Sequence, residues 1–427
     1  MKSAFPKVPL EFEPEWDRSM KILREADYIA LTSGKRTFPW RYFVIADEKG
    51  IVENTMTYQL ASKNKLQDVS WIKPGQTAWD WWNYAIVPGV DFKSGRNFET
   101  FKYFVDFASR NNIPYSILDE GWSKSTSEPF TPSEQSRLFD LIEYANQKNV
   151  GIFVWLTWVA VDNNLETLFK TYKEWGIKGV KIDFMDRSDQ WMVKYYERVI
   201  KEAAKYQIYV LFHGSFKPAG LEVAYPNLLS YEGVRGLEQM GNCDPDNSIY
   251  LPFMRNAVGP MDFTPGAMIN LQSDSYIERK PNPAAKGTRA YQMALFVVFE
   301  SGIQMLADSP HRYDREPECR DFITSVPVTW DETKVLEAKI GEYIIVAKRK
   351  GNKWFLGGIT NSKEERNFTV NMDFLDSSRS YKMTSFEDGM NADIQAMDYR
   401  KKEILVKAND NINIKMVRNG GFAAVIE

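Results

Sequence analysis

The feature that most constrains the fold of this chain is a regular alternation of apolar and amphipathic segments between residues 66 and 325. Residues 151–157 are typical of a buried strand, and a helix is expected to begin at Thr131, where Glu134 would complete a capping box. The same order of strand, loop and helix recurs along this region, as in parallel βαβ units. The other expected strands lie at 115–122, 179–186, 208–214, 228–232 and 303–308.

Polar side chains gather at the carboxyl ends of these expected strands. They are Asp80, Asp119, Glu120, Thr157, Asp183, His213, Glu232 and Asp308. In a (β/α)8 barrel the active site lies at that end of the strands. The alternative is a doubly wound open sheet, but no Gly-x-Gly-x-x-Gly motif follows a strand and no phosphate-binding loop occurs. The sequence therefore predicts an α/β fold with a (β/α)8 barrel over residues 66–325.

The regions on both sides of the expected barrel are typical of β structure. Residues 1–65 contain strand-like runs at 28–32 and 40–46, which are too few to make an independent domain. We expect this segment to be the remnant of an N-terminal β-sandwich. Residues 326–427 hold short β runs separated by turn residues, and this pattern predicts a C-terminal antiparallel β-sandwich.

Composition argues against several classes of protein. The net charge of −3 over 427 residues, without a basic run, speaks against a nucleic-acid partner. No apolar run is long enough to cross a membrane, and the first residues lack the apolar core of a signal peptide. With two histidines a zinc site is improbable, while Cys243 and Cys319 could form one disulfide. An aromatic content of 14% suits stacking on sugars, or an aromatic core.

Charged residues in two of the strand segments indicate chemistry. Lys181 and Asp183 share one face of their strand, and burying both is costly unless they are paired or functional. Asp183 is therefore either a nucleophile or the partner of Lys181 in an ion pair. Glu232 and Glu238 follow a later strand, and either could donate a proton, bind calcium, or lie in a solvated loop. Two carboxylates at two strand ends are what a glycosidase needs.

Further candidates surround these carboxylates. The aromatic and polar segment 78–83 could form a sugar platform or pack in the core, and His213 could contact substrate or be structural. The candidate substrate-binding residues are Asp80, Trp82, Asp119, Glu120, Lys181 and His213.

The order of motifs along the chain resembles glycoside hydrolase family 97. The matching motifs are AWDWWN at 78–83, LDEGW at 118–122, GVKIDFMD at 179–186, YEGVRGLE at 231–238 and GPMDFTPG at 259–266. The resemblance implies a large N-terminal β-sandwich, a barrel, a C-terminal sandwich and a calcium ion beside the active site. Residues 1–65 would match only the last strands of that first sandwich.

The resemblance also implies roles for individual residues. Asp183 matches the nucleophile of the retaining members and Glu238 matches the acid/base, while Glu232 and Glu238 match calcium ligands. Inverting members use a base glutamate after the fifth strand, where this chain has Gly214. The resemblance therefore favours the retaining branch, which acts on α-galactosides.

The leading hypothesis is a retaining, exo-acting α-galactosidase that hydrolyses terminal α-galactosides through a covalent glycosyl-enzyme intermediate. The alternatives are an inverting α-glucosidase of the same family and a non-catalytic carbohydrate-binding remnant. The resemblance implies a periplasmic or secreted location and an oligosaccharide or α-galactoside substrate. The composition indicates no nucleic acid or membrane as a partner.

Overall fold

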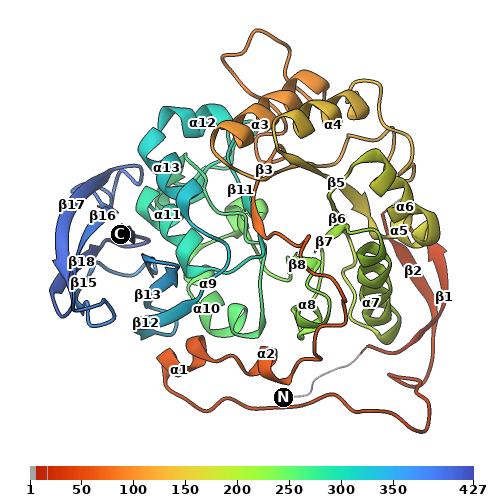
Figure 1. Cartoon of the computed structure of the whole chain (residues 1–427), viewed down its shortest axis with the longest axis horizontal. Coiled ribbons are helices and arrows are strands. Elements are labelled where there is room, and N and C mark those ends of the chain that lie inside the picture. The colour runs from red at the N-terminus through yellow and green to blue at the C-terminus, as the bar shows by residue number, and fades with distance from the viewer. Residues whose placement is uncertain (1–5, 17) are drawn as a thin grey trace.

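The computed structural model describes residues 6–16 and 18–427, and a barrel of parallel strands forms its centre (Figure 1). The hydrogen-bonded order of these strands is β11-β3-β4-β5-β6-β7-β8. Their bounds are β3 Gly75–Trp79, β4 Tyr115–Leu118, β5 Gly151–Thr157, β6 Gly179–Asp183, β7 Tyr209–Phe212, β8 Leu228–Tyr231 and β11 Ile303–Leu306. Every pairing between them is parallel, which confirms the predicted barrel architecture.

An irregular segment, residues 261–265, fills the eighth position of the barrel. The backbone N–H of Asp262 donates to the carbonyl of Tyr231 at 2.7 Å, directly at the end of β8. The N–H of Ala307 donates to the carbonyl of Pro265 at 3.0 Å, just after β11. These bonds link the two edge strands through the segment and close the barrel at its carboxyl end.

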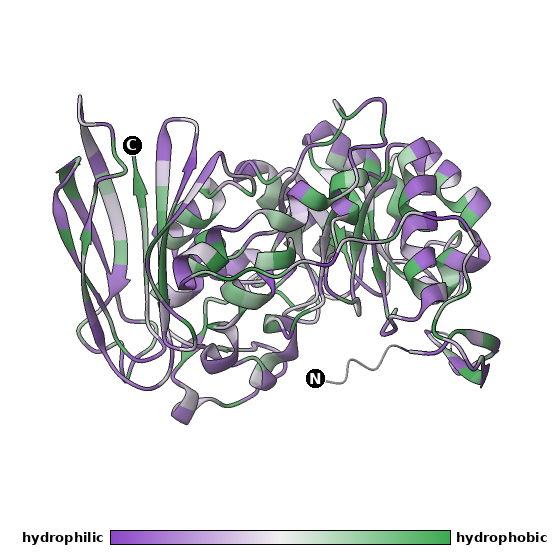
Figure 2. Cartoon of the chain, turned by 90° about the horizontal axis from the view of Figure 1, so that it is seen from below, coloured by the Kyte–Doolittle hydropathy of each residue, from purple (hydrophilic) through white to green (hydrophobic). Residues whose placement is uncertain are grey.

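Helices cover the outside of the barrel and present apolar faces to its strands (Figure 2). In the longest of them, α7, Met192, Tyr196 and Val199 recur at helical spacing and are buried. The helices of this region are α3 Phe98–Arg110, α4 Leu138–Gln147, α5 Trp158–Asn163, α6 Leu165–Trp175, α7 Gln190–Lys205, α8 Leu221–Ala224, α9 Pro245–Ser248, α10 Leu251–Met254, α11 Arg289–Val298, α12 Pro310–Arg315 and α13 Pro317–Ser325.

Short elements complete the loops of the barrel. They are the 3₁₀ turns η1 Leu237–Asn242, η2 Asn256–Val258 and η3 Ser273–Ser275 and the two-residue strands β9 Asn270–Leu271 and β10 Ala285–Lys286. The predicted capping box at Thr131 is wrong, because α4 begins only at Leu138. The backbone around Pro132 is instead used in an isolated bridge to Ser123, and this tertiary pairing prevents the helix from starting earlier.

The N-terminal part differs from the prediction. Its elements are the antiparallel strands β1 Pro9–Pro14 and β2 Met20–Glu25 and the helices α1 Glu48–Glu53 and α2 Met56–Leu60. The strands predicted at 28–32 and 40–46 are wrong, because both runs are irregular in the structure. Strands need hydrogen-bonded neighbours, and no described strand pairs with these runs. Phe43 and Ile45 are consequently 93% and 96% exposed.

The C-terminal part is an antiparallel β-sandwich, as predicted. One sheet has the order β12-β13-β14-β19-β16-β17, and β15 pairs with β18 in the other. The strands are β12 Glu332–Lys339, β13 Tyr343–Lys350, β14 Lys353–Thr360, β15 Arg366–Asn371, β16 Ser380–Asp388, β17 Tyr399–Lys407, β18 Asn411–Met416 and β19 Gly421–Ile426. A separate apolar core lies between the sheets. The domain limits at residues 65 and 325 stay predictions.

Helix α11 joins the barrel to this sandwich by close packing. Gly421 of β19 approaches the helix so tightly that a Cβ there would lie 2.4 Å from the Cα of Tyr291. Only glycine permits this distance between the strand and the helix.

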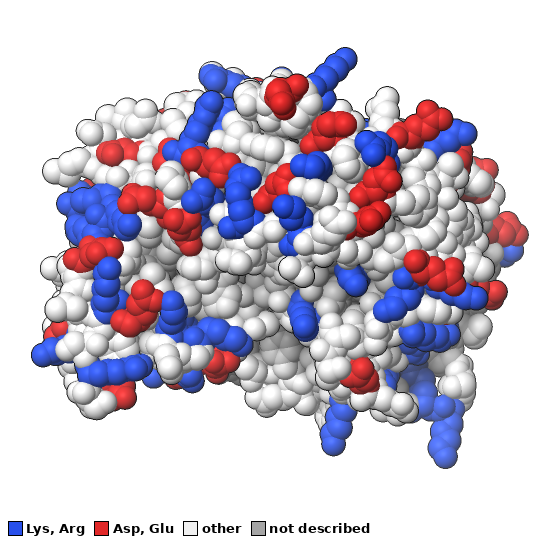
Figure 3. Space-filling model, turned by 45° about the horizontal axis from the view of Figure 1, so that its top comes forward, with Lys and Arg blue, Asp and Glu red and all other residues white. Residues whose placement is uncertain are grey.

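The remaining global features agree with the composition. Acidic and basic side chains are interspersed on the face shown in Figure 3. Within the described residues, no helix has the length and apolar character to cross a membrane. Cys243 and Cys319 are both buried and free, so they do not form a disulfide.

Candidate active site

Five acidic or basic side chains that follow different strands meet at the carboxyl end of the barrel. Their side chains lie close together in the structure, while their roles in catalysis, substrate binding or metal binding stay predictions. They are Asp80 after β3, Asp119 after β4, Asp183 at the end of β6, His213 after β7 and Glu232 after β8. Glu238 joins them from η1. Parallel strands place all their carboxyl ends on one rim, which is why residues far apart in sequence come together.

A fully buried lysine, Lys181, stands at the centre of this rim. Its Nζ lies 2.8 Å from Asp119 Oδ2, 3.9 Å from Glu238 Oε2 and 4.9 Å from the centre of the Trp79 ring. Burial alone would lower the pKa of Lys181, but the nearby carboxylates outweigh this effect and raise the pKa above its ordinary value. Lys181 is therefore a permanent positive charge beneath the site.

Asp119 lies next to Lys181, and Asp80 lies next to Asp119. Burial would raise the pKa of Asp119, but Lys181 at 2.8 Å holds that pKa below its usual value. The Asp119 backbone N–H donates to Asp80 Oδ1 at 3.0 Å. Burial, together with the charge of Asp119, raises the pKa of Asp80 to about 7. The two neighbouring carboxyls therefore differ in protonation near neutral pH.

Asp183 is held by one donor on each carboxylate oxygen. The Phe184 N–H donates to Oδ1 at 2.7 Å, and the indole N–H of Trp155 donates to Oδ2 at 3.0 Å. The residue is partly exposed, unlike Lys181 on the same strand. Its carboxylate is thus both fixed in orientation and open to a ligand.

The loop after Asp183 packs tightly against Gly214. Gly214 has a φ of +53°, and its carbonyl accepts from the Asp186 N–H at 2.5 Å. A Cβ at position 214 would lie 2.9 Å from the Phe184 nitrogen and 3.0 Å from Asp186 Oδ1. A larger side chain at position 214 would therefore displace the turn that carries Asp183.

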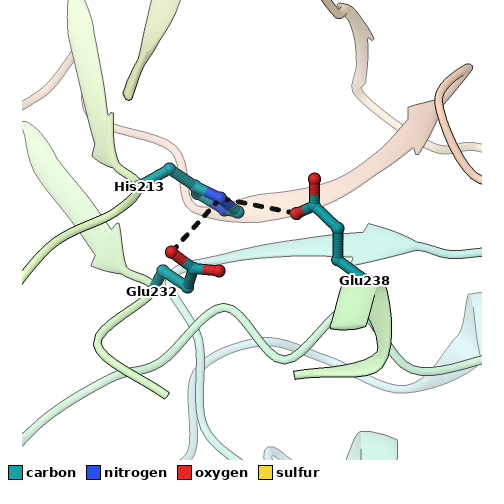
Figure 4. Close-up of side chains that lie close together, drawn as sticks. All are labelled: His213, Glu232 and Glu238. Atoms are coloured by element: carbon teal, nitrogen blue, oxygen red, sulfur yellow. Dashed lines mark ion pairs between the residues drawn. The ribbon is translucent and has the colours of Figure 1, made fainter. Parts of the chain in front are cut away.

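His213 faces two glutamates, as Figure 4 shows. Its Nδ1 lies 3.8 Å from Glu232 Oε2 and 3.6 Å from Glu238 Oε2. Its Nε2 lies 2.6 Å from Asp262 Oδ2, in the segment that fills the eighth barrel position. The same Glu232 oxygen accepts the Gly214 N–H at 2.6 Å.

The protonation of this cluster is set by opposing effects. Burial raises the pKa of Glu238 to about 7, although Lys181 and His213 act in the opposite direction. For His213, burial and Lys181 lower the pKa, but the carboxylates of Glu232 and Asp262 outweigh them and raise it to about 9. A carboxyl with a pKa near neutrality is suited to donate and accept a proton.

The cluster also has the donor atoms of a cation site. One ligand atom each of His213, Glu232 and Glu238 lies within 4.8 Å of the others. Glu238 Oε2 is buried and accepts no hydrogen bond from the described residues. The two carboxylates fit the preference of calcium for oxygen ligands, whereas the imidazole is a ligand more typical of transition metals. The set therefore fits a divalent cation, with two carboxylate ligands from this chain.

Two predicted residues lie outside this central cluster. Glu120 is 20% exposed and pairs with Arg18, which follows the N-terminal strand β1, at 2.6 Å. Trp82 is 1% exposed and packs in the core, which is one of the two alternatives that the sequence left open; its assignment to substrate binding stays a prediction.

The sequence reasoning missed two residues of the site, Trp155 and Asp262. Strand alternation could have found Trp155, because it lies two residues before Thr157 and therefore on the same face of β5. Asp262 lies inside the motif at 259–266, but only the tertiary structure shows that it contacts His213.

Comparison with known proteins identifies the family of this chain. The model of the family described as glycoside hydrolase 97 matches residues 81–234, and that of its C-terminal domain, described with the word oligomerisation, matches residues 329–427. The chain is 42% identical over 415 residues to a retaining alpha-galactosidase of Bacteroides thetaiotaomicron, covering 96% of this chain and 62% of the relative.

Two further similarities agree with this result. The chain is 32% identical over 400 residues to a probable retaining alpha-galactosidase of Streptomyces bingchenggensis, covering 92% of this chain and 59% of the relative. It superposes with a TM-score of 0.80 and 28% identity on a glycoside hydrolase family 97 enzyme in complex with acarbose, from Pseudoalteromonas sp. strain K8. That match covers 89% of this chain and 64% of the solved one. The chain thus spans less than two thirds of each of these proteins.

Proposed function

Because the chain belongs to glycoside hydrolase family 97, we propose that it is a retaining, exo-acting α-galactosidase that hydrolyses terminal α-galactosides. The observation that carries the proposal is the arrangement around Lys181. A partly exposed Asp183, whose carboxylate is fixed by two hydrogen-bond donors, lies on the same strand as Lys181. Oε2 of Glu238 lies 3.9 Å from the Lys181 Nζ. Burial raises the pKa of Glu238 to about 7, which suits a group that gives and takes a proton.

The proposed reaction has two steps. In the first, an oxygen of Asp183 forms a bond to the anomeric carbon while the bond to the leaving oxygen breaks, and Glu238 gives its proton to that oxygen. In the second, Glu238 removes a proton from water, the water oxygen bonds to the anomeric carbon, and the ester bond to Asp183 breaks. Each step inverts the carbon once, so the sugar leaves with its original configuration.

The close packing at Gly214 supports retention over inversion. A base glutamate at this position, which an inverting mechanism of this family would use, has no space for its Cβ beside Phe184 and Asp186. The turn that presents Asp183 occupies that volume. The names of the two curated relatives, both described as retaining, agree with this assignment.

We also propose that a calcium ion binds here, with the carboxylates of Glu232 and Glu238 as ligands. The Oε2 of Glu238, which is buried and accepts no hydrogen bond from the described residues, and the convergence of three donor atoms support a cation there. Two carboxylates supply only part of the six to eight oxygens that calcium takes, so other oxygen ligands would complete it. When bound, the ion would supply positive charge next to the acid/base and orient oxygen groups of the substrate.

The product anomer tests the proposal. Hydrolysis of p-nitrophenyl α-galactoside, followed by NMR in the presence of calcium, is expected to release the α-anomer of galactose first. Initial release of the β-anomer would contradict retention. A folded, calcium-loaded chain that binds galactosides without hydrolysing them would instead support a non-catalytic carbohydrate-binding protein.

A location in the periplasm or outside the cell is also proposed, on the basis of the family alone. Fractionation of cells that express the chain from its own gene would test it, and recovery of the protein only in the cytoplasmic fraction would contradict it. The oligomerisation named for the C-terminal family model suggests contacts between copies through residues 329–427.

A further inference from the structure

We infer that Trp155 is a positioning residue that holds the carboxylate of Asp183 in the orientation needed for attack; this inference rests on the proposed function. Trp155 lies on β5, where its register partner on β6 is Lys181. Its side chain is 4% exposed, and its indole N–H donates to Asp183 Oδ2 at 3.0 Å. A buried side chain on a barrel strand has little freedom, so it offers a rigid donor.

Trp155 acts together with the turn that follows Asp183. The Phe184 N–H holds the other oxygen, Oδ1, at 2.7 Å, and Phe184 itself has a φ of +67°. The indole of Trp155 also packs edge-on against the Phe184 ring, with 6.0 Å between ring centres and an interplanar angle of 85°. One tryptophan thus supports the carboxylate directly and the turn that provides its second donor.

The orientation of Asp183 also matters for Lys181, whose ion pairs in the structure are with Asp119 and Glu238. Lys181 is fully buried, points from the same strand, and acts electrostatically on Asp183. An Asp183 released from Trp155 would be drawn toward this ammonium group, away from the open side of the rim. The hydrogen bond from Trp155 therefore keeps the Asp183 carboxylate near the positive charge of Lys181 but out of direct contact with it. A direct ion pair with Lys181 would block the oxygen that attacks the sugar.

The chain provides a matched control in Trp122. This tryptophan is fully buried, and its indole N–H donates at 2.7 Å to the backbone carbonyl of Trp155. It therefore has the same kind of buried indole donor, directed to the same strand, but it does not bond to Asp183. Trp122→Phe and Trp155→Phe both remove one N–H and retain an aromatic ring.

The test compares these two variants with the wild-type chain on p-nitrophenyl α-galactoside. We expect Trp155→Phe to lower kcat about ten- to a hundredfold, the range for a hydrogen bond to a charged group. We expect KM to change by less than about twofold, because the bond acts on attack and not on substrate binding. Trp122→Phe should keep kcat within about threefold of wild type, since its bond ends on a backbone carbonyl.

Crystal structures of both variants provide a readout that does not need turnover. The Asp183 carboxylate should rotate toward Lys181 in Trp155→Phe and stay in place in Trp122→Phe. An unchanged kcat in Trp155→Phe, or equal losses in both variants, would overturn the inference. If the wild-type chain does not hydrolyse the substrate, the proposed function fails, and the orientation of Asp183 in the two crystal structures then decides the positioning role: an unmoved carboxylate in Trp155→Phe would overturn it.

Discussion

Two buried lysines, Lys181 in the barrel and Lys348 in the C-terminal sandwich, show how differently the two parts of the molecule use charge. Lys348 is 2% exposed and pairs with one carboxylate, Glu300, at 2.8 Å. Lys181 is 0% exposed and interacts with three, those of Asp119, Glu238 and Asp183.

This difference separates a structural charge pair from a functional one. The pair between Lys348 on β13 and Glu300, in the barrel loop between α11 and β11, is balanced, and the Glu300 side chain is 35% exposed, so it retains contact with water. At the barrel rim several carboxylates share one buried lysine, and burial raises the pKa of Glu238 to about 7, with a smaller contribution from the charges of Asp119 and Asp183. Excess buried charge is costly to the fold, and the sites that keep it are typical functional sites.

The largest expected effect concerns Asp183, a partly exposed carboxylate that acts on Lys181. Asp183→Asn should lower kcat on the order of 10⁴-fold, because an amide cannot form the glycosyl ester. The thermal midpoint should change little, since the amide oxygen can still accept from Trp155. Steady-state kinetics and a thermal scan on the same preparations would check this. A variant with wild-type activity would show that the charge excess at the rim serves another purpose.

The next effect compares the lysines directly. Lys181→Met leaves buried carboxylates without a counter-charge and should cost about 3–5 kcal/mol of unfolding free energy. Lys348→Met should cost about 1–2 kcal/mol, because Glu300 can turn to water. Urea unfolding of both variants, followed by tryptophan fluorescence, measures the difference. Equal losses would remove the distinction between a balanced and an unbalanced site.

The pH dependence of stability offers a third comparison. The pKa of Asp80 is raised from 3.8 to about 7 in the native state, chiefly by burial and then by Asp119. Between about pH 4 and 7 the native state keeps this proton while the unfolded state loses it, so stability falls as the pH rises and then levels off. The contribution is about 4 kcal/mol at most.

Asp80→Asn isolates this contribution, because the amide oxygen can still accept from the Asp119 N–H. The variant should lose less stability than wild type between pH 4 and pH 8. Urea midpoints at both pH values measure the change. A pH dependence identical to that of wild type would show that Asp80 does not carry a raised pKa.

The smallest effect gives the reference point for exposed charge. Lys382 and Glu403 lie 2.9 Å apart on β16 and β17, with side chains 50% and 49% exposed. Lys382→Met should leave the urea midpoint unchanged within experimental error, because water and salt screen the pair. A loss as large as that of Lys348→Met, measured in the same urea series, would mean that burial is not what distinguishes these lysines.

Most of the barrel could be predicted, because its strands carry their own signal. The run 151–157 is apolar and β-rich, and the structure forms β5 over Gly151–Thr157. The prediction failed where a strand needs a partner or a helix start depends on a tertiary contact. Residues 40–46 have strand-like composition but no described strand pairs with them, and the bridge between Ser123 and Pro132 moved the start of α4.

The candidate site was predictable in its residue types but not in its contacts. Strand ends identified Asp119, Asp183 and Glu232, because parallel strands bring their carboxyl ends together. The sequence offered Asp183 as the ion-pair partner of Lys181, whereas in the structure the 2.8 Å contact of Lys181 is with Asp119. Side chains from neighbouring strands compete for one ammonium group, and only distances in space decide between them.

The sequence by itself determined the alternation of strands and helices, the family motifs and the presence of an aspartate on the same strand face as a lysine. The tertiary structure alone decided which group holds that aspartate, that Gly214 leaves no room for a base, and that Asp262 reaches His213 from an irregular segment. The physical reason is the range of each effect. Periodicity and strand propensity act over a few residues, while hydrogen bonds, burial and close packing join residues that only the closed barrel brings together.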